Sequence, residues 1–553
     1  MLMKKYLFIF LSVSLTYGYA QQKRDSICTH KAIYDEDSRL LPWYKPEIPG
    51  AGYDKVINLA SDFIKNRCPV EPTTNLKLFM VHTYFLTPRE VGQVTFNKGL
   101  SGSDDGLTPA CTYANFVKSF VLGYYPYSGD SSYIGLVRNC LDRIIDHGTT
   151  PAGWAWAKCP YASANPRSPE YFGATHWGVG GRNDGPFVIE PDKVGELGIE
   201  YLHFYEVTEE KKYLDAAIDC ADALAKNVRK AGKEDYLKEP LHSPWPFRVS
   251  AENGQVHEEY TANVIESIKL LDELIRVKAR IVLGDERIGQ YTKTREMVWQ
   301  WLFSTEGPMR TFIWKGYFED IPNDTYNKNR VQNIPLETAR YLIMNPDKDP
   351  DYNIHVPALI YWVATAFKDD KMDAIKEQFW CYASMGSHTA RYASICALWY
   401  EKTKNEWYKD QAFRYFNWAT YVCDENGYVI VGPDFVKQYW FSDGYGDYVR
   451  HFLEGLAAIP EWAPARENHL LRSSSVVSHI FYSQKGISCT TYDNQSEILF
   501  RLTSKPEKIT VDGQFIGETK KLSDNSWTWK TLNKDGGVLR VCYSSGNKLN
   551  IDL

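Results

Sequence analysis

Segments with helical hydrophobic spacing follow one another in pairs up to about residue 460. The most regular pair is formed by residues 196–208, which are apolar and rich in small side chains, and residues 212–228, which are amphipathic. Apolar positions three and four residues apart predict α-helices, and the short connection between the two segments predicts that they pack as a hairpin. The repetition of this unit predicts a mainly α fold built from helical hairpins.

The first helices of the pairs are expected to begin near Thr108, Asp192, His257, Glu337, His388 and Asp443. Five of them precede a second helix, and the amphipathic segment 53–66 supplies a sixth partner. An open solenoid is the alternative, but solenoid repeats have periods of about 34–47 residues and these hairpins are spaced more widely and unequally. We therefore predict a closed (α/α)6 toroid, in which the first helices line the inside and their N-termini gather on one face, where they favour anions.

After about Ser473 the spacing changes from helical to alternating. Six short segments with alternating apolar residues are separated by Gly, Asn, Asp or Lys-Pro, and residues 511–514 have the sequence of a hairpin turn. This pattern predicts a small antiparallel β-sandwich. The expected organisation is a toroid over residues 21–470 and a sandwich over residues 471–553.

The first twenty residues have the pattern of a signal peptide. Lys4 and Lys5 precede an apolar run, and small residues stand before Gln21. The run is shorter than the ~20 apolar residues that a membrane span requires. The residue directly after the expected cut is Gln21 and not a Cys. We therefore expect a secreted, periplasmic protein without a lipid anchor or transmembrane segment.

Composition narrows the class of partner. The chain has 63 basic and 69 acidic residues, a formal charge of −6 without long runs of either sign, which argues against a nucleic-acid partner. Aromatic residues make up 14% of the chain, with 17 Trp and 38 Tyr. They fit either a large aromatic core or a cleft whose aromatic side chains stack on sugars. No metal-ligand motif is present, and neither a metal nor a cofactor is expected.

The stretch 171–198 combines aromatic, basic and acidic residues among glycines. His176, Trp177, Arg182 and Asp184 lie in it, and it runs into the helix predicted to begin near Asp192. Such a loop suits the binding of an acidic sugar and acid chemistry on it. Asp184 is the first choice for a catalytic carboxyl, although Asn-Asp-Gly is also a common turn sequence.

A second carboxyl is expected from the segment that we predict to open the third inner helix, where Glu258 and Glu259 stand between His257 and Tyr260. Adjacent side chains point in different directions, so only one of the two acids would face a cleft. An acidic first turn that complements the helix dipole is the structural alternative.

Other candidates come from three further places. Trp245 and Trp177 would stack on sugar faces, and Arg248 and Arg182 would bind a uronate carboxylate through two parallel hydrogen bonds. His388 stands at a helix start, where a capping role is the alternative. Glu337 and Arg340 have i, i+3 spacing and would pair with each other. At the last inner helix the candidates are Trp440, Asp443 and Tyr445, of which Asp443 also fits an N-cap with Ser442.

A ring of helical hairpins with a C-terminal β domain resembles the six-hairpin glycosidase superfamily. The stretches 182–187 (RNDGPF) and 257–263 (HEEYTAN) are similar to the exo-β-glucuronidases of glycoside hydrolase family 154. This resemblance implies a hydrolase that releases a glucuronic-acid-like unit from an acidic glycan. No signature motif matches position by position, so no catalytic residue is carried over.

Three functions follow from these residues. The first is a glycoside hydrolase that uses Asp184 with Glu258 or Glu259 as its carboxyl pair. The second is a polysaccharide lyase with His176, His257 or Tyr260 as its base. The third is a glycan-binding toroid without catalysis, which needs aromatic residues and arginine but no converging carboxylates. An oligosaccharide or polysaccharide partner is common to all three.

Overall fold

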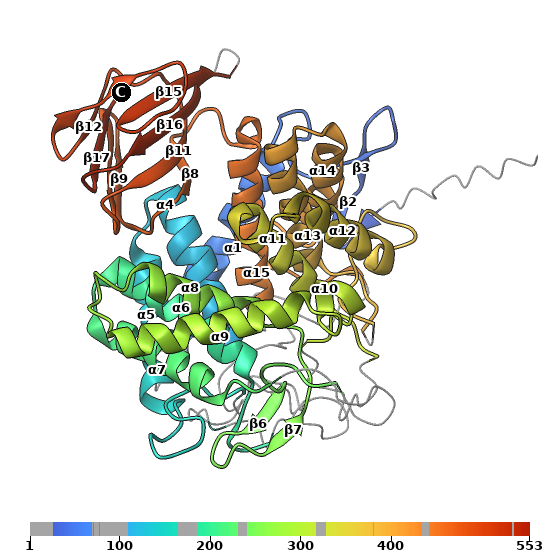
Figure 1. Ribbon diagram of the computed structural model, residues 1–553. Coiled ribbons are helices and arrows are strands. Elements are labelled where there is room, and N and C mark those ends of the chain that lie inside the picture. The colour runs from blue at the N-terminus through green and yellow to red at the C-terminus, as the bar shows by residue number, and fades with distance from the viewer. Residues whose placement is uncertain are drawn as a thin grey trace, which may run out of the picture.

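Six helices form the inner wall of a closed ring in the computed structural model (Figure 1), which describes residues 26–68, 70, 77, 109–163, 172, 185–230, 241–316, 328–379, 381–433, 442–532 and 536–553. The inner helices are α3 (Pro109–Phe116) with its π-helical continuation η2 (Val117–Tyr124), α6 (Pro191–Thr208), α8 (Ile265–Arg276), α11 (Asn333–Met344), α13 (Gly386–Thr403) and α15 (Ser442–Ala458). Each packs against the next one, and α15 packs back against α3 and η2. The closed toroid predicted from the sequence is confirmed.

A second layer of helices surrounds the ring. Each inner helix packs against an outer one: α5 (Ser132–His147), α7 (Lys211–Asn227), α9 (Asp285–Phe303), α12 (Tyr352–Phe367), α14 (Glu406–Thr420) and α1 (Ala51–Asp62), which continues as η1 (Phe63–Arg67). Because α1 packs against α15, the N-terminal segment does supply the sixth partner. Short helices α4 (Tyr125–Ser128), α10 (Pro308–Thr311), η3 (Pro346–Lys348) and η5 (Pro460–Trp462) lie in the connections.

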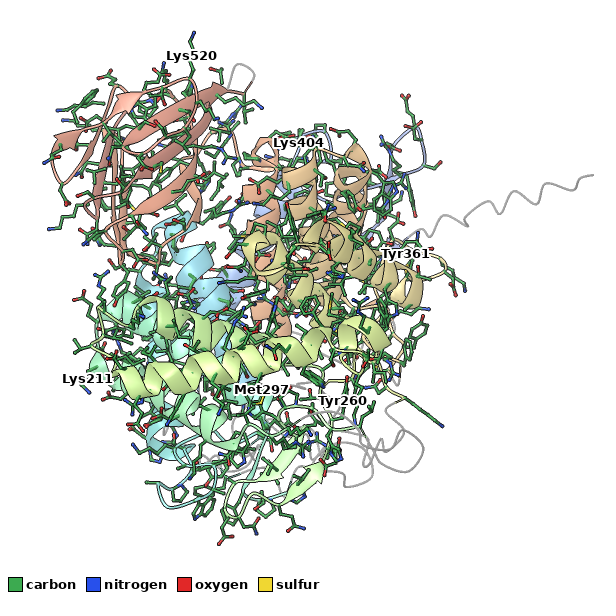
Figure 2. The ribbon with its side chains drawn as sticks, viewed as in Figure 1. Lys211, Tyr260, Met297, Tyr361, Lys404 and Lys520 are labelled. Carbon is green, nitrogen blue, oxygen red and sulfur yellow. The ribbon has the colours of Figure 1, made fainter. Side chains whose placement is uncertain are left out.

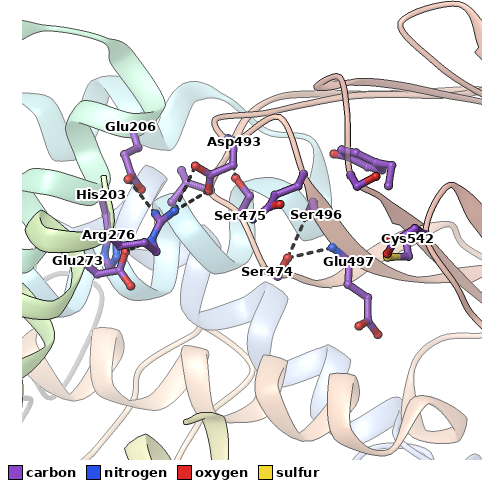
Figure 3. A pocket seen from close by; sticks show the side chains of 15 residues that line it. His203, Glu206, Glu273, Arg276, Ser474, Ser475, Asp493, Ser496, Glu497 and Cys542 are labelled. Carbon is purple, nitrogen blue, oxygen red and sulfur yellow. Dashed lines mark hydrogen bonds and ion pairs between the residues drawn. The ribbon is translucent and has the colours of Figure 1, made fainter. Parts of the chain in front are cut away.

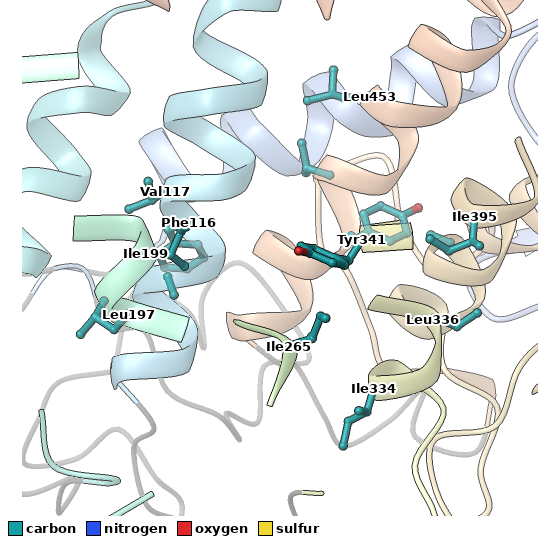
Figure 4. Close-up of a cluster of buried hydrophobic side chains, with 14 of the residues drawn as sticks. Phe116, Val117, Leu197, Ile199, Ile265, Ile334, Leu336, Tyr341, Ile395 and Leu453 are labelled. Atoms are coloured by element: carbon teal, nitrogen blue, oxygen red, sulfur yellow. The ribbon is translucent and has the colours of Figure 1, made fainter. Parts of the chain in front are cut away.

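The hydrophobic core fills the space between the helices of the ring. Figure 4 shows Phe116, Leu197, Ile265, Leu336 and Ile395, one from each of five inner helices, and all are at most 1% exposed. The outer helices bury a single face; α7 turns Ala217, Ala221 and Leu224 inward at helical spacing. The sequence contrast between all-round apolar first helices and amphipathic second helices therefore reflects the two layers.

A glycine sets the close approach of α6 and α8. A Cβ atom added to Gly195 would lie 2.1 Å from Ser267 Oγ and 2.8 Å from Ser267 Cα. Any larger side chain would therefore push the two helices apart. Pro191 occupies the first turn of α6, where its missing N–H costs no hydrogen bond.

The C-terminal residues form two five-stranded sheets that face each other. The first sheet has the order β13-β12-β17-β10-β9 and the second β14-β15-β16-β11-β8. Their strands are β8 (His469–Ser473), β9 (Val477–Ser483), β10 (Gly486–Thr491), β11 (Ser496–Leu502), β12 (Lys508–Val511), β13 (Gln514–Phe515), β14 (Gly517–Glu518), β15 (Ser526–Thr531), β16 (Gly537–Tyr543) and β17 (Lys548–Asp552). Alternating side chains such as Phe500, Leu539 and Ile551 are buried between the sheets. The predicted hairpin turn is confirmed, since Val511 pairs with Gln514 and both Asp512 and Gly513 have positive φ.

Short strands lie at two other places. β1 (Ser26–Ile27) pairs with β2 (His30–Lys31), and β3 (Ile33–Tyr34) with β4 (Leu40–Leu41). A three-stranded sheet of β5 (Val188–Ile189), β6 (Arg248–Ser250) and β7 (Val256–Glu258) precedes α6 and α8. The prediction that an inner helix begins at His257 is therefore wrong: this residue lies on β7, and α8 begins at Ile265. No helix in the described ranges has the length and apolar character of a membrane span, and the expected signal peptide lies outside them.

Candidate active site

The inner helices run parallel to one another, so they all begin at the same end of the ring. Contacts between neighbouring inner helices join corresponding turns: Gly195 of α6 approaches Ser267 of α8, and Arg391 of α13 lies 3.2 Å from Glu337 of α11. All four residues lie within the first two turns of their helices. The sheet β5-β6-β7 lies at the same end (Figure 1), because β5 leads directly into α6.

A buried chain of charged side chains connects this sheet to α6. Arg248 Nε donates to Glu190 Oε1 at 2.9 Å, and Arg248 Nη1 donates to Glu258 Oε1 at 3.3 Å. Lys193 Nζ lies 2.6 Å from Glu190 Oε2, and Lys315 Nζ lies 3.5 Å from Glu258 Oε2. None of the five side chains is more than 9% exposed. Three cations and two carboxylates among the described residues thus meet in one buried site.

Asp192 lies in the first turn of α6, beside this chain of charges. Its Oδ1 accepts from the backbone N–H of Lys193 at 2.8 Å and its Oδ2 from Asn263 Nδ2 at 3.1 Å. The residue is 3% exposed. Burial raises the pKa of the Asp192 carboxyl to about 6, although the Lys193 ammonium and the Asn263 hydrogen bond oppose the rise. At pH 6 about half of the molecules would carry a protonated carboxyl here.

Glu258 and Glu259 point in different directions, as expected for neighbouring residues in extended chain. Glu259 Oε2 lies 2.5 Å from Arg229 Nη1 and 2.9 Å from His242 Nδ1. Although burial alone would raise it, the hydrogen bonds and charges of His242 and Arg229 lower the pKa of Glu259. Glu258 belongs to the buried charge chain, whereas His257 is exposed on β7.

Three of the candidate residues are core side chains. Trp245 is 1% exposed and its Nε1 donates to the Leu224 carbonyl at 2.9 Å. Tyr260, also 1% exposed and labelled in Figure 2, donates its hydroxyl to the Ile313 carbonyl at 2.9 Å, and burial raises its pKa. Tyr445 is fully buried and donates to the Gly427 carbonyl at 2.9 Å. In this arrangement the ring of Trp245 presents no face to a sugar, and neither hydroxyl is placed to act as a base.

Arg248 also differs from the expectation. Its guanidinium is engaged by two protein carboxylates rather than held open for a uronate. Asp443 lies in the first turn of α15, and only its backbone is described. The remaining candidates fall outside the described residues: His176, Trp177, Arg182, Asp184 and Trp440.

A network of ion pairs occupies the centre of the ring, where the six inner helices face one another. Lys118 lies 3.1 Å from Glu196 and Lys269 lies 2.7 Å from Glu266. The network continues through Glu337, whose carboxylate lies 2.8 Å from Arg450. Among the described residues it comprises five acids (Glu196, Glu266, Glu337, Asp447 and Glu454) and five bases (Lys118, Lys269, Arg340, Arg391 and Arg450). The expected pairing of Glu337 with Arg340 is confirmed, with 3.1 Å between Oε2 and Nε.

Two histidines border this network. His388, in the first turn of α13, lies 3.0 Å from Arg391 Nη1 and 3.7 Å from Asp447 Oδ2. Burial and the charge of Arg391 lower the pKa of His388 to about 4, although the hydrogen bond with Asp447 opposes the shift. Burial and the adjacent Arg450 also lower the pKa of His451. His388 is therefore a neutral imidazole at pH 7, at the end of the ring where the helices begin.

The sequence did not identify Asp192, Lys193 or Lys315 as site residues. Asp192 was recognised only as the start of a helix, and the Pro-Asp pair in a first turn is the signal that would have drawn attention to it. The described residues contain no group of three His, Cys, Asp or Glu side chains arranged to hold a metal ion.

Comparison with known proteins gives structural likeness at low sequence identity. No protein-family model matches the chain, and no curated protein is similar to it in sequence. A sugar epimerase from a ruminal bacterium is 11% identical, with a TM-score of 0.49, and the match covers 73% of this chain and 98% of that one. The cellobiose 2-epimerase of Spirochaeta thermophila DSM 6192 is 12% identical, with a TM-score of 0.49 and coverages of 74% and 97%. An unsaturated glucuronyl hydrolase specific for heparin is 11% identical, with a TM-score of 0.41 and coverages of 73% and 96%.

Proposed function

We propose that this chain is a secreted glycoside hydrolase that releases a uronic acid from the end of an acidic glycan, at the end of the ring where the inner helices begin. The observation that carries the proposal is Asp192, a carboxyl whose pKa is raised to about 6 by burial, against the opposing charge of Lys193. Hydrolysis of a glycosidic bond requires a carboxylic acid that is still protonated near neutral pH, together with a second, ionised carboxylate.

Asp192 would be the general acid that protonates the departing glycosidic oxygen. For the second carboxylate we propose Asp184, which precedes α6 in the sequence, acting either on water or on the anomeric carbon. Glu258 and Glu259 suit this role less well, because each is already held by two cationic or hydrogen-bonding neighbours.

An acidic substrate fits the charges at this end of the ring. The chain from Lys193 to Lys315 contains three cations, and the N-termini of parallel helices add partial positive charge. Arg182 is proposed as the direct ligand of the uronate carboxylate, and His176, Trp177 and Trp440 as contacts to the sugar. We also propose that the similarity of the stretches 182–187 and 257–263 to glycoside hydrolase family 154 reflects this activity.

His388 favours a second candidate, a polysaccharide lyase. Elimination at a uronate needs a base that is unprotonated before it takes the proton. His388 meets this requirement at pH 7, although its pKa of about 4 makes it a weak base. The hydroxyl of Tyr260 is committed to the Ile313 carbonyl and does not serve this mechanism.

One incubation separates the candidates. The full chain would be mixed with uronic-acid-containing oligosaccharides, and the release of saturated uronic acid would be followed together with the ultraviolet absorbance of an unsaturated product. We expect saturated uronic acid, which Asp192→Asn abolishes and Asp215→Asn, at a half-exposed position on α7, leaves unchanged. A rise in absorbance would replace the hydrolase by the lyase, and binding without any product would leave a glycan-binding protein.

A further inference from the structure

A pocket of about 490 Å³ lies between the helical ring and the β-sandwich (Figure 3). Its ring side is formed by the last turns of α6 and α8, and its sandwich side by the β8–β9 and β10–β11 connections and by residues near 524 and 542–544. This volume is within the range of about 300–1,000 Å³ that small-molecule sites occupy. Glu206 in the pocket lies 14 positions after Asp192 along α6, a rise of about 21 Å. The pocket is therefore separate from the candidate active site.

The pocket is lined by more acids than bases. Its carboxylates are Glu206, Glu273, Asp493, Glu497 and Asp524, and its cations are Arg276 and His203. Although burial opposes it, the charge and hydrogen bond of Glu200 raise the pKa of His203 to about 9, so His203 is charged at pH 7. The lining itself nevertheless has more acidic than cationic side chains.

Arg276 is already shared among three of these acids. Its Nε lies 2.5 Å from Glu273, its Nη1 3.1 Å from Asp493 and its Nη2 3.4 Å from Glu206. Figure 3 shows these contacts on one side of the pocket. On the sandwich side, Glu497 and Asp524 are exposed. Glu497 Oε1 lies 3.4 Å from Arg540 Nη1, whereas the described contacts of Asp524 are limited to a weak one from the Cys542 thiol. Asp524 therefore keeps its negative charge on that wall without a cationic partner among the described residues.

Hydroxyl groups make up much of the remaining surface. Ser474, Ser475, Ser496 and Ser544 line the pocket, and a hydroxyl can both donate and accept a hydrogen bond. Tyr543 is 1% exposed, so its ring offers no stacking face. The pocket thus suits a ligand held by hydrogen bonds and charge rather than by an aromatic platform.

We propose that this pocket binds a small amine that also carries hydroxyl groups, an amino sugar being the simplest member of that class. Its ammonium would lie between the wall acids Glu497 and Asp524 and the acids around Arg276, and its hydroxyls would bond to the serines. A uronate would be repelled by the same carboxylates, so this pocket and the active site would select sugars of opposite charge.

Glu206 gives the proposal a dependence on pH. Burial raises the pKa of Glu206 to about 7, although His203 and Arg276 oppose the rise. The charged groups that face it are His203, Glu273, Arg276 and Asp493. An ammonium favours the ionised form of Glu206, so the affinity for the protonated form of the amine should increase as the pH rises through about 7.

Calorimetric titration of the full chain with glucosamine, glucose, glucuronate and spermidine tests the proposal. We expect glucosamine to bind more tightly than glucose, and glucuronate, which the active site would bind, not to compete with glucosamine. The double variant Glu497→Gln/Asp524→Asn should weaken glucosamine binding about tenfold, the effect of losing charge-assisted hydrogen bonds. Glu518→Gln, on the same sandwich but outside the pocket, is the matched control and should change nothing.

Several results would overturn the proposal. They are the absence of glucosamine binding, displacement of glucosamine by glucuronate, or glucosamine binding that the double variant leaves unchanged. Binding of spermidine without glucosamine would also overturn it, because hydroxyl groups would then contribute nothing. Hydrolysis of a uronic-acid substrate should be the same in the double variant and the wild type, which separates this test from that of the proposed function.

Discussion

Arg450 of α15 donates a hydrogen bond to Glu337 of α11 over 2.8 Å, and so connects two inner helices that are separated in the ring by α13. Both side chains are at most 10% exposed. The network to which they belong contains equal numbers of acids and bases among the described residues, so the ring encloses charge without a large net imbalance. Removal of one partner would leave the others buried and uncompensated.

We predict that Arg450→Met destabilises the fold by about 3–5 kcal/mol, the usual cost of breaking a buried ion pair from one side. Lys211→Met, which removes an exposed pair with Asp215 on the outside of α7 (Figure 2), should cost about 1 kcal/mol or less. Urea unfolding followed by circular dichroism measures both. Equal effects of the two substitutions would show that the central network does not hold the ring together.

Gly195→Ala should destabilise the protein by about 1–3 kcal/mol or more, because the Cβ of the new alanine would overlap Ser267 and force α6 away from α8. The control is Gly135→Ala in α5, where no atom lies within 4 Å of the added Cβ. That change should stabilise by about 0.5–1 kcal/mol through helix propensity. Thermal melting of the two variants gives the comparison, and a neutral Gly195→Ala would contradict the close contact of the helices.

His388 should make the fold sensitive to acid. Its pKa is about 4 in the folded chain against an ordinary value of 6.5, so the unfolded chain takes up this proton first as the pH falls. Its contribution to stability is complete above pH 6.5 and is lost progressively down to pH 4, by about 3 kcal/mol. His388→Asn should therefore flatten the stability profile in this window, whereas His257→Asn, at an exposed position, should leave it unchanged. Parallel profiles for wild type and His388→Asn would refute the assignment.

The sequence predicted most of the architecture because helical and alternating periodicities are local signals. The order of inner and outer helices and the turn at Asp512 and Gly513 followed from them. Strands of two or three residues, such as β5 and β7, are too short to produce a period, and an acidic segment before a helix has the same pattern as a first helical turn. This similarity explains why α8 was expected to begin at His257.

The candidate site was less predictable for a physical reason. Polar residues such as Lys118 and Arg391 have the spacing of an ordinary solvent-exposed helix face, and only closure of the ring turns that face inward. The raised pKa of Asp192 likewise comes from its burial in the folded chain. Trp245 was expected to stack on a sugar because it lies just before the segment that begins at His257, but the structure places it against Leu224 in the core.

The activity should depend on pH through Asp192. Because the carboxyl must be protonated to act as the acid, kcat/KM for a uronic-acid disaccharide should fall as the pH rises through about 6. A profile measured from pH 4.5 to 8 would show this basic limb. Activity that stays constant or increases above pH 7 would exclude Asp192 as the proton donor.

The role of Asp192 as the general acid is tested most directly by assaying the Asp192→Asn variant on two substrates. A uronic-acid disaccharide has a leaving group that must be protonated, whereas an aryl uronide with a strongly acidic phenol departs without help. We predict a loss of about 10²–10⁴-fold in kcat/KM on the disaccharide and little loss on the aryl uronide. Equal losses on both substrates, or no loss on the disaccharide, would contradict the role of Asp192 as the general acid.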